Sequence, residues 1–248
     1  MRERTRPLVA ALSFLTAVPV ARGTELGARD LRRGVVLFPV VGAAVGALVA
    51  VVAWGAALFL PPLAAAILGV ASGVAATAAL HLDGLGDVAD GIGASLAGGD
   101  PRGAMRDPRL GTFGIAAVSL DLLLKATLLS ALLAVTGFPW EVVAVGAISR
   151  VAPIGLAWRL PYVGAGSGGW TDGMSGLRSL AALVLSLAIG VPTARLATLG
   201  IVVAVAAVAI GVGAWSNRRL GGVTGDVFGA AVELAETMGL LAAAIAVR

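Results

Sequence analysis

The sequence contains no cysteine and only one histidine, His81, among its 248 residues. The absence of cysteine excludes disulfides, cysteine nucleophiles and cysteine-ligated zinc or iron–sulfur centres, and a lone histidine excludes a multi-histidine metal centre. Any metal ion is therefore expected to be held by oxygen atoms. Aromatic residues are also scarce, at 5% of the chain, so few side chains are available for stacking on nucleic-acid bases. We expect no nucleic-acid partner.

Charged residues are scarce as well. They make up 13% of the chain, whereas 58% of the residues are hydrophobic and the mean hydropathy is +0.97. A water-soluble domain is about half apolar and about a quarter charged. The composition therefore predicts an integral membrane protein in contact with the lipid bilayer. The 35 glycines and the alanine-rich runs suit close helix packing in lipid and would also permit a homo-oligomer.

Long uncharged stretches predict an all-α, polytopic helix bundle. A membrane-spanning helix needs about 20 apolar residues to cross about 30 Å of hydrocarbon. The sequence offers about seven such stretches, at 35–60, 63–80, 113–135, 142–158, 177–191, 196–215 and 227–247. No internal repeat or separate soluble domain is visible. We therefore treat residues 1–248 as a single membrane domain.

The N-terminal segment, residues 1–33, is basic and contains a short apolar run at 7–21. Polar residues and Pro19 interrupt this run, and a second basic stretch follows directly, which does not fit a cleaved signal peptide. We expect an interfacial or re-entrant helix here. The seven arginines of the segment predict a cytoplasmic N-terminus in the cell inner membrane. Alternation of the spans then places two loops, 82–112 and 216–226, on the same cytoplasmic face.

Three aspartates follow the second predicted span at a helical spacing. Asp83, Asp87 and Asp90 are four and three residues apart, so on a helix their carboxylates lie within an arc of roughly 60°. Like charges so close together repel unless a cation neutralises them, and carboxylate oxygens favour Mg²⁺, with Mn²⁺ as a substitute. We predict a magnesium site here and assign catalytic roles to the same aspartates. The alternative is a solvated acidic turn at the end of a membrane helix.

An arginine-rich segment lies in the same predicted loop. Arg106 and Arg109 flank Pro108, and Thr112 belongs to a Gly-Thr-Phe-Gly sequence that opens the next helix. Guanidinium groups and the free amides of a helix N-terminus bind phosphate well. We predict that Arg106, Arg109 and Thr112 bind a phosphate-bearing substrate. The alternative is that the arginines only keep the loop in the cytoplasm.

Two basic residues lie inside predicted spans. Lys125 follows Asp121 by four residues, and Arg150 has no acidic neighbour in its own span. Charged groups at membrane depth are costly and are usually paired or functional. We predict that Lys125 and Arg150 bind substrate phosphate. One alternative is a structural ion pair of Lys125 with Asp121, and another is that Glu233 and Glu236 of the last span neutralise the cations.

A glycine-rich turn precedes the last span. It reads Gly-Gly-Val-Thr-Gly-Asp and places Thr224 and Asp226 at the start of a helix. We predict that Asp226 completes the metal site of Asp83, Asp87 and Asp90, and that Thr224 contacts the substrate. Both residue types are also ordinary helix caps, which is the alternative interpretation.

Carboxylates and cations at one membrane face suit metal-assisted displacement at phosphorus. A metal ion neutralises phosphate oxygens, cationic side chains bind the remaining charge, and a carboxylate takes the proton of an attacking hydroxyl. The sequence has neither a Walker motif nor a protein-kinase signature, so ATP hydrolysis is not indicated. A cation or substrate transporter that uses the intramembrane charges is an alternative from a different class.

The ordered motifs resemble those of the cobalamin synthase family, the adenosylcobinamide-GDP ribazoletransferases. The resemblance covers residues from about 1 to 240 and rests on motifs that occur in the same order. These are Asp83-Gly84-Leu85-x-Asp87-x-x-Asp90-Gly91, Met105-x-Asp107-x-Arg109-x-Gly111-Thr112-Phe113-Gly114, Lys125, Ser149-Arg150 and Gly222-Val223-Thr224-Gly225-Asp226. The combination is far more specific than any one of its parts. One departure is Leu82, where many members are expected to have a glutamate.

The resemblance implies an integral membrane enzyme that requires Mg²⁺. It also implies a reaction that joins adenosylcobinamide-GDP to α-ribazole or α-ribazole 5′-phosphate, gives adenosylcobalamin or its 5′-phosphate, and releases GMP. The chemistry predicted from the residues agrees, because a hydroxyl would attack phosphorus and GMP would leave. A CDP-alcohol phosphotransferase is a related alternative, but in that family Asp-Gly is followed by Ala-Arg and the aspartates are more widely spaced than Asp87 and Asp90.

Overall fold

The computed structural model describes residues 3–21, 25–164 and 169–248. Within these ranges the regular secondary structure is helical, apart from one isolated β-bridge between Tyr162 and Val223. The α-helices are α1 (Arg6–Leu15), α2 (Ala28–Gly34), α3 (Phe38–Ala57), α4 (Pro62–Ala76), α5 (Leu80–Leu96), α6 (Pro101–Ala104), α7 (Thr112–Thr136), α8 (Trp140–Ser149), α9 (Val151–Arg159), α10 (Gly176–Ala194), α11 (Ala197–Leu220) and α12 (Gly225–Ala246). The predicted all-α class is confirmed.

Six helical segments of the described chain are long and apolar enough to cross a membrane. They are Ala28–Ala57, Thr112–Thr136, Trp140–Arg159, Gly176–Ala194, Ala197–Leu220 and Gly225–Ala246. Helices α4 and α5 pass the same test only as a pair that is bent by 91°, which brings the number to seven if the pair forms one broken span. This range agrees with the prediction of about seven spans.

The bend between α4 and α5 places the aspartates on a helix of their own. It lies at Ala78 and Ala79, whose φ angles of 50° and 57° fall in the left-handed region. Residues with a Cβ seldom adopt this region, so the neighbouring helices hold the chain in a costly conformation here. Residues 82–112 were predicted to form a loop, but most of them are helical and belong to α5 and α6.

Two segments form the centre of the bundle. In their most apolar windows, 78% of the residues are buried for α8 with α9 and 67% for α12, compared with 22–39% for the other four spans. The central segments carry Arg150, Glu233 and Glu236. The surrounding helices therefore shield these charges from lipid.

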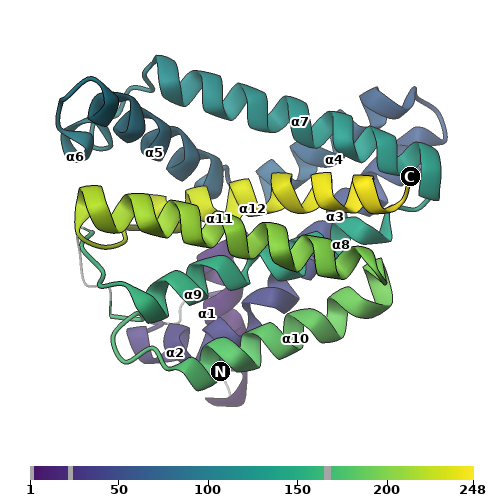
Figure 1. Cartoon of the computed structure of the whole chain (residues 1–248). Coiled ribbons are helices and arrows are strands. Elements are labelled where there is room, and N and C mark those ends of the chain that lie inside the picture. The colour runs from purple at the N-terminus through teal and green to yellow at the C-terminus, as the bar shows by residue number, and fades with distance from the viewer. Residues whose placement is uncertain (1–2, 22–24, 165–168) are drawn as a thin grey trace.

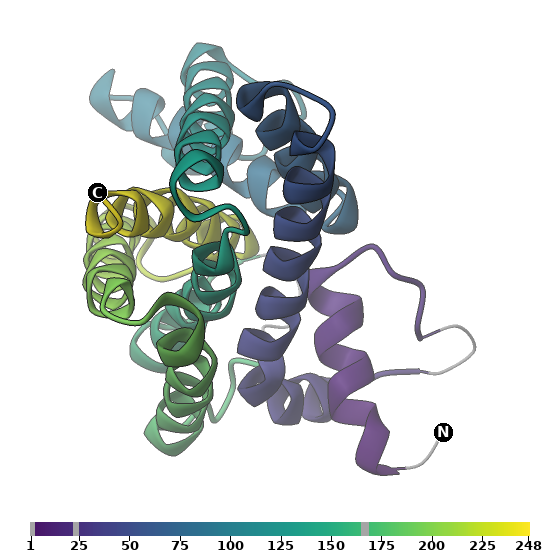
Figure 2. The same ribbon diagram turned by 90° about the vertical axis from the view of Figure 1, so that its right-hand side faces the viewer.

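The helix arrangement brings α5, α6 and the α11–α12 turn to the same end of the bundle. Figure 1 shows α7, α11 and α12 with roughly parallel axes, with α5, α6 and the α11–α12 turn at one end and the C-terminus at the other. Figure 2 shows α1 and α2, in purple, on the outside of the bundle beside α3. The ring of Phe14 on α1 stacks on that of Phe38 at 5.7 Å. The predicted N-terminal helix is present, whereas its interfacial position stays a prediction; Arg2 and Arg22 of the basic segment lie outside the described residues.

Candidate active site

The acidic site lies where α5 meets the first turn of α12. Asp83, Asp87 and Asp90 lie on α5, and Asp226 is the second residue of α12. The two helices touch at Gly84, where a Cβ would lie 2.6 Å from the carbonyl oxygen of Asp226. A side chain at this position would push the helices apart. Gly84 therefore lets Asp226 lie directly against the helix that carries the other three carboxylates.

The four carboxylates form one electrostatic group. Asp83, Asp90 and Asp226 each act on the charge of Asp87, and Asp83 also acts on Asp226. Asp83 is exposed, and the other three residues are half-buried. Negative charges that interact in this way repel one another, and a cation among them would relieve the repulsion. The structure thus brings together the residues predicted to bind metal.

The carboxylates do not form a closed metal cage. Within residues 3–21, 25–164 and 169–248, no three histidine, aspartate or glutamate side chains are arranged to hold an ion by themselves. Mg²⁺ is usually held by one or two carboxylates, with waters and substrate phosphates as its other ligands. The oxygen donors and their partial exposure fit a site of this open kind, in which the substrate supplies part of the coordination.

Asp90 also has a structural role. Its two carboxylate oxygens accept hydrogen bonds from the backbone amides of Gly111, at 2.7 Å, and Gly114, at 2.8 Å, at the start of α7. A Cβ at Gly114 would lie 2.5 Å from Asp90 Oδ2, so the contact requires glycine. Asp90 therefore caps α7 and fastens it to α5. This contact was not predicted from the sequence, where the start of this helix was interpreted as a phosphate site.

The three residues predicted to bind phosphate near this helix end lie in different surroundings. Arg109 is 86% exposed and pairs with Asp107 at 2.9 Å. Hydrogen bonds from Arg109 lower the pKa of the Asp107 carboxyl to about 2. Thr112 is exposed at the first position of α7, and Arg106 is exposed beside a cavity. Of the three, Arg106 lines the cavity described next.

This cavity of about 250 Å³ adjoins the acidic site, and we call it the α6 cavity. Its walls include Arg102, Arg106, Tyr162, Leu220, Thr224 and Asp226. The guanidinium of Arg102 donates a hydrogen bond to the carbonyl oxygen of Leu220 and so ties α6 to the end of α11. The two segments that the arginine distribution predicts on one membrane face therefore lie side by side.

Thr224 has two structural roles in this region. Its hydroxyl oxygen accepts a hydrogen bond from the amide of Val227 at 3.3 Å, which makes it the N-cap of α12. The same hydroxyl lies 3.4 Å from Asp226 Oδ2, to which it donates. Thr224 thus orients Asp226 as well as lining the α6 cavity. The capping alternative from the sequence holds for Thr224, and its predicted substrate contact stays a prediction.

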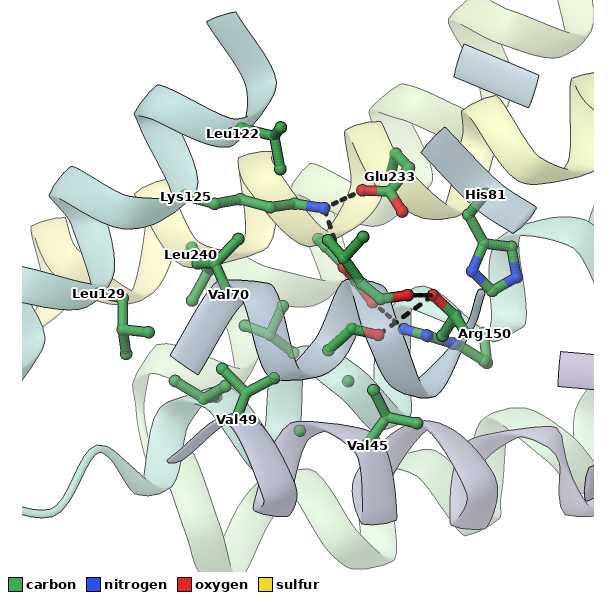
Figure 3. A pocket seen from close by; sticks show the side chains of 18 residues that line it. Val45, Val49, Val70, His81, Leu122, Lys125, Leu129, Arg150, Glu233 and Leu240 are labelled. Carbon is green, nitrogen blue, oxygen red and sulfur yellow. Dashed lines mark hydrogen bonds and ion pairs between the residues drawn. The ribbon is translucent and has the colours of Figure 1, made fainter. Parts of the chain in front are cut away.

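Lys125 and Arg150 lie deep in the bundle and are neutralised by acids (Figure 3). The Nζ atom of Lys125 pairs with Glu233, with Glu236 at 2.9 Å and with Asp121 at 3.2 Å. Arg150 pairs with Glu236 and donates to the hydroxyl of Ser149. The structure therefore agrees with the alternative interpretations, in which Asp121 of α7 and Glu233 and Glu236 of α12 neutralise these cations. Their predicted contact with substrate phosphate stays a prediction.

A cavity of about 60 Å³ adjoins this buried network (Figure 3). Its polar side is lined by Thr77, His81, Lys125, Arg150, Glu233 and Glu236, and apolar residues of α3, α4, α7, α8 and α12 line the rest. A space of this size can hold a few water molecules. It is too small for a nucleotide.

Two residues of this region were not predicted from the sequence. Arg102 and Tyr162 line the α6 cavity, although no motif singled them out. Arg102 reaches the cavity through its contact with Leu220, which is 118 residues away in the sequence. Motif spacing does not reveal such a contact. Leu82 is 7% exposed on α5 beside the exposed Asp83, so the acidic group is built without a carboxylate at that position.

The fold and the site together define a multi-pass α-helical membrane protein with an acidic group and a basic cavity at one end of its bundle. Comparison with known proteins makes the assignment more specific. The model of the cobalamin-5-phosphate synthase family matches residues 7–244, and the chain belongs to this family of enzymes.

Several relatives cover nearly the whole chain and carry the name adenosylcobinamide-GDP ribazoletransferase. The protein of Azorhizobium caulinodans is 38% identical and the match covers 96% of this chain and 95% of the relative. The protein of Thiobacillus denitrificans is 35% identical, and the match covers 97% of this chain and 95% of the relative. The protein of Roseiflexus sp. is 36% identical, and the match covers 94% of this chain and 87% of the relative. No solved structure matches the chain. The resemblance found from the motifs is therefore confirmed.

Proposed function

We propose that this protein is an Mg²⁺-dependent adenosylcobinamide-GDP ribazoletransferase. The names of relatives that cover 94–97% of the chain support this activity. The structural observation that supports it best is the meeting of Asp83, Asp87 and Asp226 beside a cavity with two arginines. Such a combination suits the transfer of a phosphoryl-linked group, because it can bind a metal and anionic oxygens at the same place.

The reaction is a displacement at phosphorus. The ribose hydroxyl of α-ribazole or α-ribazole 5′-phosphate attacks the phosphorus that is bonded to the cobinamide. A new phosphodiester bond forms, and the bond from this phosphorus to the oxygen of the GMP group breaks. The hydroxyl proton passes to a carboxylate of α5, and GMP leaves with the electron pair of the broken bond. The other product is adenosylcobalamin or its 5′-phosphate.

The acidic residues have separate tasks in this proposal. Asp83, Asp87 and Asp226 are the principal metal ligands, and bound Mg²⁺ would neutralise the pyrophosphate oxygens and stabilise the leaving group. Asp90 keeps the start of α7 against α5, and its remaining lone pairs are available to a metal or a proton. Lys125 and Arg150 balance the carboxylates of Glu233 and Glu236 within the central helices.

The active site is proposed to face the cytoplasm of a cell with the protein in its inner membrane. The arginines of residues 1–33, together with Arg102, Arg106 and Arg109, support this orientation. Both hydrophilic substrates would then reach the acidic group from the side where nucleotides are abundant.

Transfer activity of the purified protein in liposomes tests this proposal. Adenosylcobinamide-GDP, α-ribazole 5′-phosphate and Mg²⁺ should give adenosylcobalamin 5′-phosphate and one GMP per corrinoid product. EDTA should abolish the reaction, and added Mg²⁺ or Mn²⁺ should restore it. Absence of product from folded protein with Mg²⁺ would contradict the activity. Equal product formation in EDTA would contradict the role of the metal.

A further inference from the structure

We propose that the α6 cavity binds the nucleotide half of the corrinoid substrate, with Arg102 and Arg106 at its phosphates and Tyr162 beside its base. This inference rests on the proposed function and names the part of the substrate that the cavity takes. The corrinoid and the ribazole would then approach the acidic group from outside the cavity.

The α6 cavity contains two arginines whose charges are not paired with carboxylates. None of the ion pairs between described residues involves Arg102 or Arg106. Arg102 donates to a neutral carbonyl, that of Leu220. In contrast, Lys125 and Arg150 are neutralised by buried carboxylates. Two arginines without carboxylate partners are suited to the oxygens of a diphosphate, which guanidinium groups bind through two parallel hydrogen bonds.

The α6 cavity shares a residue with the acidic group. Asp226 belongs both to the wall of the cavity and to the acidic group. A ligand in the cavity therefore has one end at the carboxylates, where the phosphorus reacts. In the proposed substrate the reacting phosphorus stands between the corrinoid and GMP. With GMP in the cavity, the leaving group points away from the face at which the ribazole hydroxyl attacks.

The α6 cavity is small. Its volume of about 250 Å³ is slightly below the range of about 300–1,000 Å³ that is usual for small-ligand pockets. A nucleotide can occupy such a space when the mouth stays open at the phosphate end. A corrinoid macrocycle is far too large for it.

Tyr162 is held in place by backbone hydrogen bonds and by a neighbouring ring. The amide of Val163 donates to the carbonyl oxygen of Val223 at 2.8 Å, and the amide of Val223 donates to that of Pro161 at 2.9 Å. A Cβ at Gly222 would overlap the carbonyl oxygen of Pro161, so this pairing requires the second glycine of the turn. The ring of Phe228 stacks on that of Tyr162, with centroids 6.3 Å apart and planes 24° apart. A supported aromatic ring of this kind is a platform for a nucleobase.

Equilibrium binding of GMP to the protein in lipid nanodiscs tests the proposal without turnover. Arg106→Gln should weaken GMP binding about tenfold or more, because it removes a charge-assisted contact to phosphate. Tyr162→Leu should also weaken it about tenfold, because it removes the stacking surface. Arg218→Gln is the matched control, since Arg218 is an exposed arginine at the end of α11 outside the cavity, and it should leave GMP affinity unchanged. Inorganic phosphate that binds as tightly as GMP would contradict a base site.

Steady-state kinetics identify which substrate uses the cavity. Arg106→Gln should raise the KM for adenosylcobinamide-GDP about tenfold and leave that for α-ribazole 5′-phosphate nearly unchanged. Arg106→Lys, which keeps the charge, should recover part of the loss, and native thermal unfolding of each variant should show that it is folded. A rise confined to the KM for α-ribazole 5′-phosphate, with unchanged GMP affinity, would overturn the proposal.

The two proposals fail in different ways. If the wild-type protein binds GMP through Arg106 and Tyr162 but transfers nothing, the proposed function fails and the nucleotide site stands. If the wild-type protein transfers ribazole while both variants bind GMP normally, the nucleotide site fails and the proposed function stands.

Discussion

Replacing Arg150 by methionine should destabilise the protein, because Arg150 neutralises Glu236 in the centre of the bundle. The buried network contains three carboxylates, those of Asp121, Glu233 and Glu236, and two cations, Lys125 and Arg150. Arg150→Met leaves Lys125 as the partner of all three acids. The side chain lost is the largest among the fully buried side chains of the described residues.

The expected loss can be sized from burial. Removal of one partner of a buried ion pair costs about 3–5 kcal/mol, because the remaining charge is left uncompensated. The side chain of Arg150 is 1% exposed, whereas that of Glu236 is 21% exposed. The partial exposure of Glu236 lowers the cost, so we expect about 3 kcal/mol. In a chain of this length each kcal/mol lowers the Tm by about 2–4 °C, so the Tm should fall by roughly 6–12 °C.

A double-mutant cycle measured by thermal unfolding in detergent checks the reasoning. The variants are Arg150→Met, Glu236→Gln and the combination of both, with Arg218→Met as the surface control. The combined variant should be more stable than the sum of the single losses predicts, by about 1 kcal/mol or more, because the two residues interact directly. Losses that add within about 0.5 kcal/mol would refute the ion pair. Native stability of Arg150→Met with impaired substrate binding would support the phosphate-binding role predicted from the sequence.

Three further predictions concern the acidic site and the orientation of the chain. Asp90→Ala should lower the free energy of unfolding by about 1–2 kcal/mol, because α7 loses its cap; inactive protein with unchanged stability in chemical denaturation would contradict the capping role. Gly84→Ala should lower kcat in the transfer assay by pushing Asp226 away from α5, whereas Gly55→Ala, whose Cβ would meet no atom within 4 Å, should not; equal rates would refute the close contact. Because the chain lacks cysteine, a membrane-impermeant maleimide applied to spheroplasts should label Phe59→Cys, at a site that is 87% exposed, and should leave Ala97→Cys unlabelled until the membrane is opened; the reverse pattern would invert the predicted topology.

The helices could be predicted from the sequence because lipid leaves few alternatives to an apolar helix. The break at Ala78 and Ala79 could not, since alanine is the strongest helix former and the sequence there contains no proline or glycine. The bend is fixed by tertiary packing. It decides whether the aspartates continue a membrane helix or lie on a separate one.

The acidic site could be predicted only in part. A spacing of four and three residues put Asp83, Asp87 and Asp90 on one helix face, and the structure has that helix. The same pattern could not distinguish a carboxylate that faces a ligand from one that caps another helix, as Asp90 does. That distinction depends on where the start of α7 packs.

The cations show the same limit. The sequence offered Glu233 and Glu236 as possible partners of Lys125 and Arg150, but it could not choose between these acids and a substrate. Lys125 and Glu233 are 108 residues apart in the sequence, so only the packing of α7 against α12 settles their pairing. Arg102 and Tyr162 escaped notice for the same reason, because the cavity that they line exists only in the folded chain.

GMP release by Asp87→Asn protein tests most directly the central claim that the acidic group of α5 and α12 carries the metal-dependent chemistry. The assay uses liposomes with both substrates and Mg²⁺, and the Tm of each variant shows whether it is folded. We predict that Asp87→Asn and Asp83→Asn reduce GMP release to the background rate, because each removes a charged oxygen ligand. The control Asp172→Asn, which changes an exposed aspartate between α9 and α10, should release GMP at the wild-type rate. Full activity of folded Asp83→Asn or Asp87→Asn protein would contradict the claim.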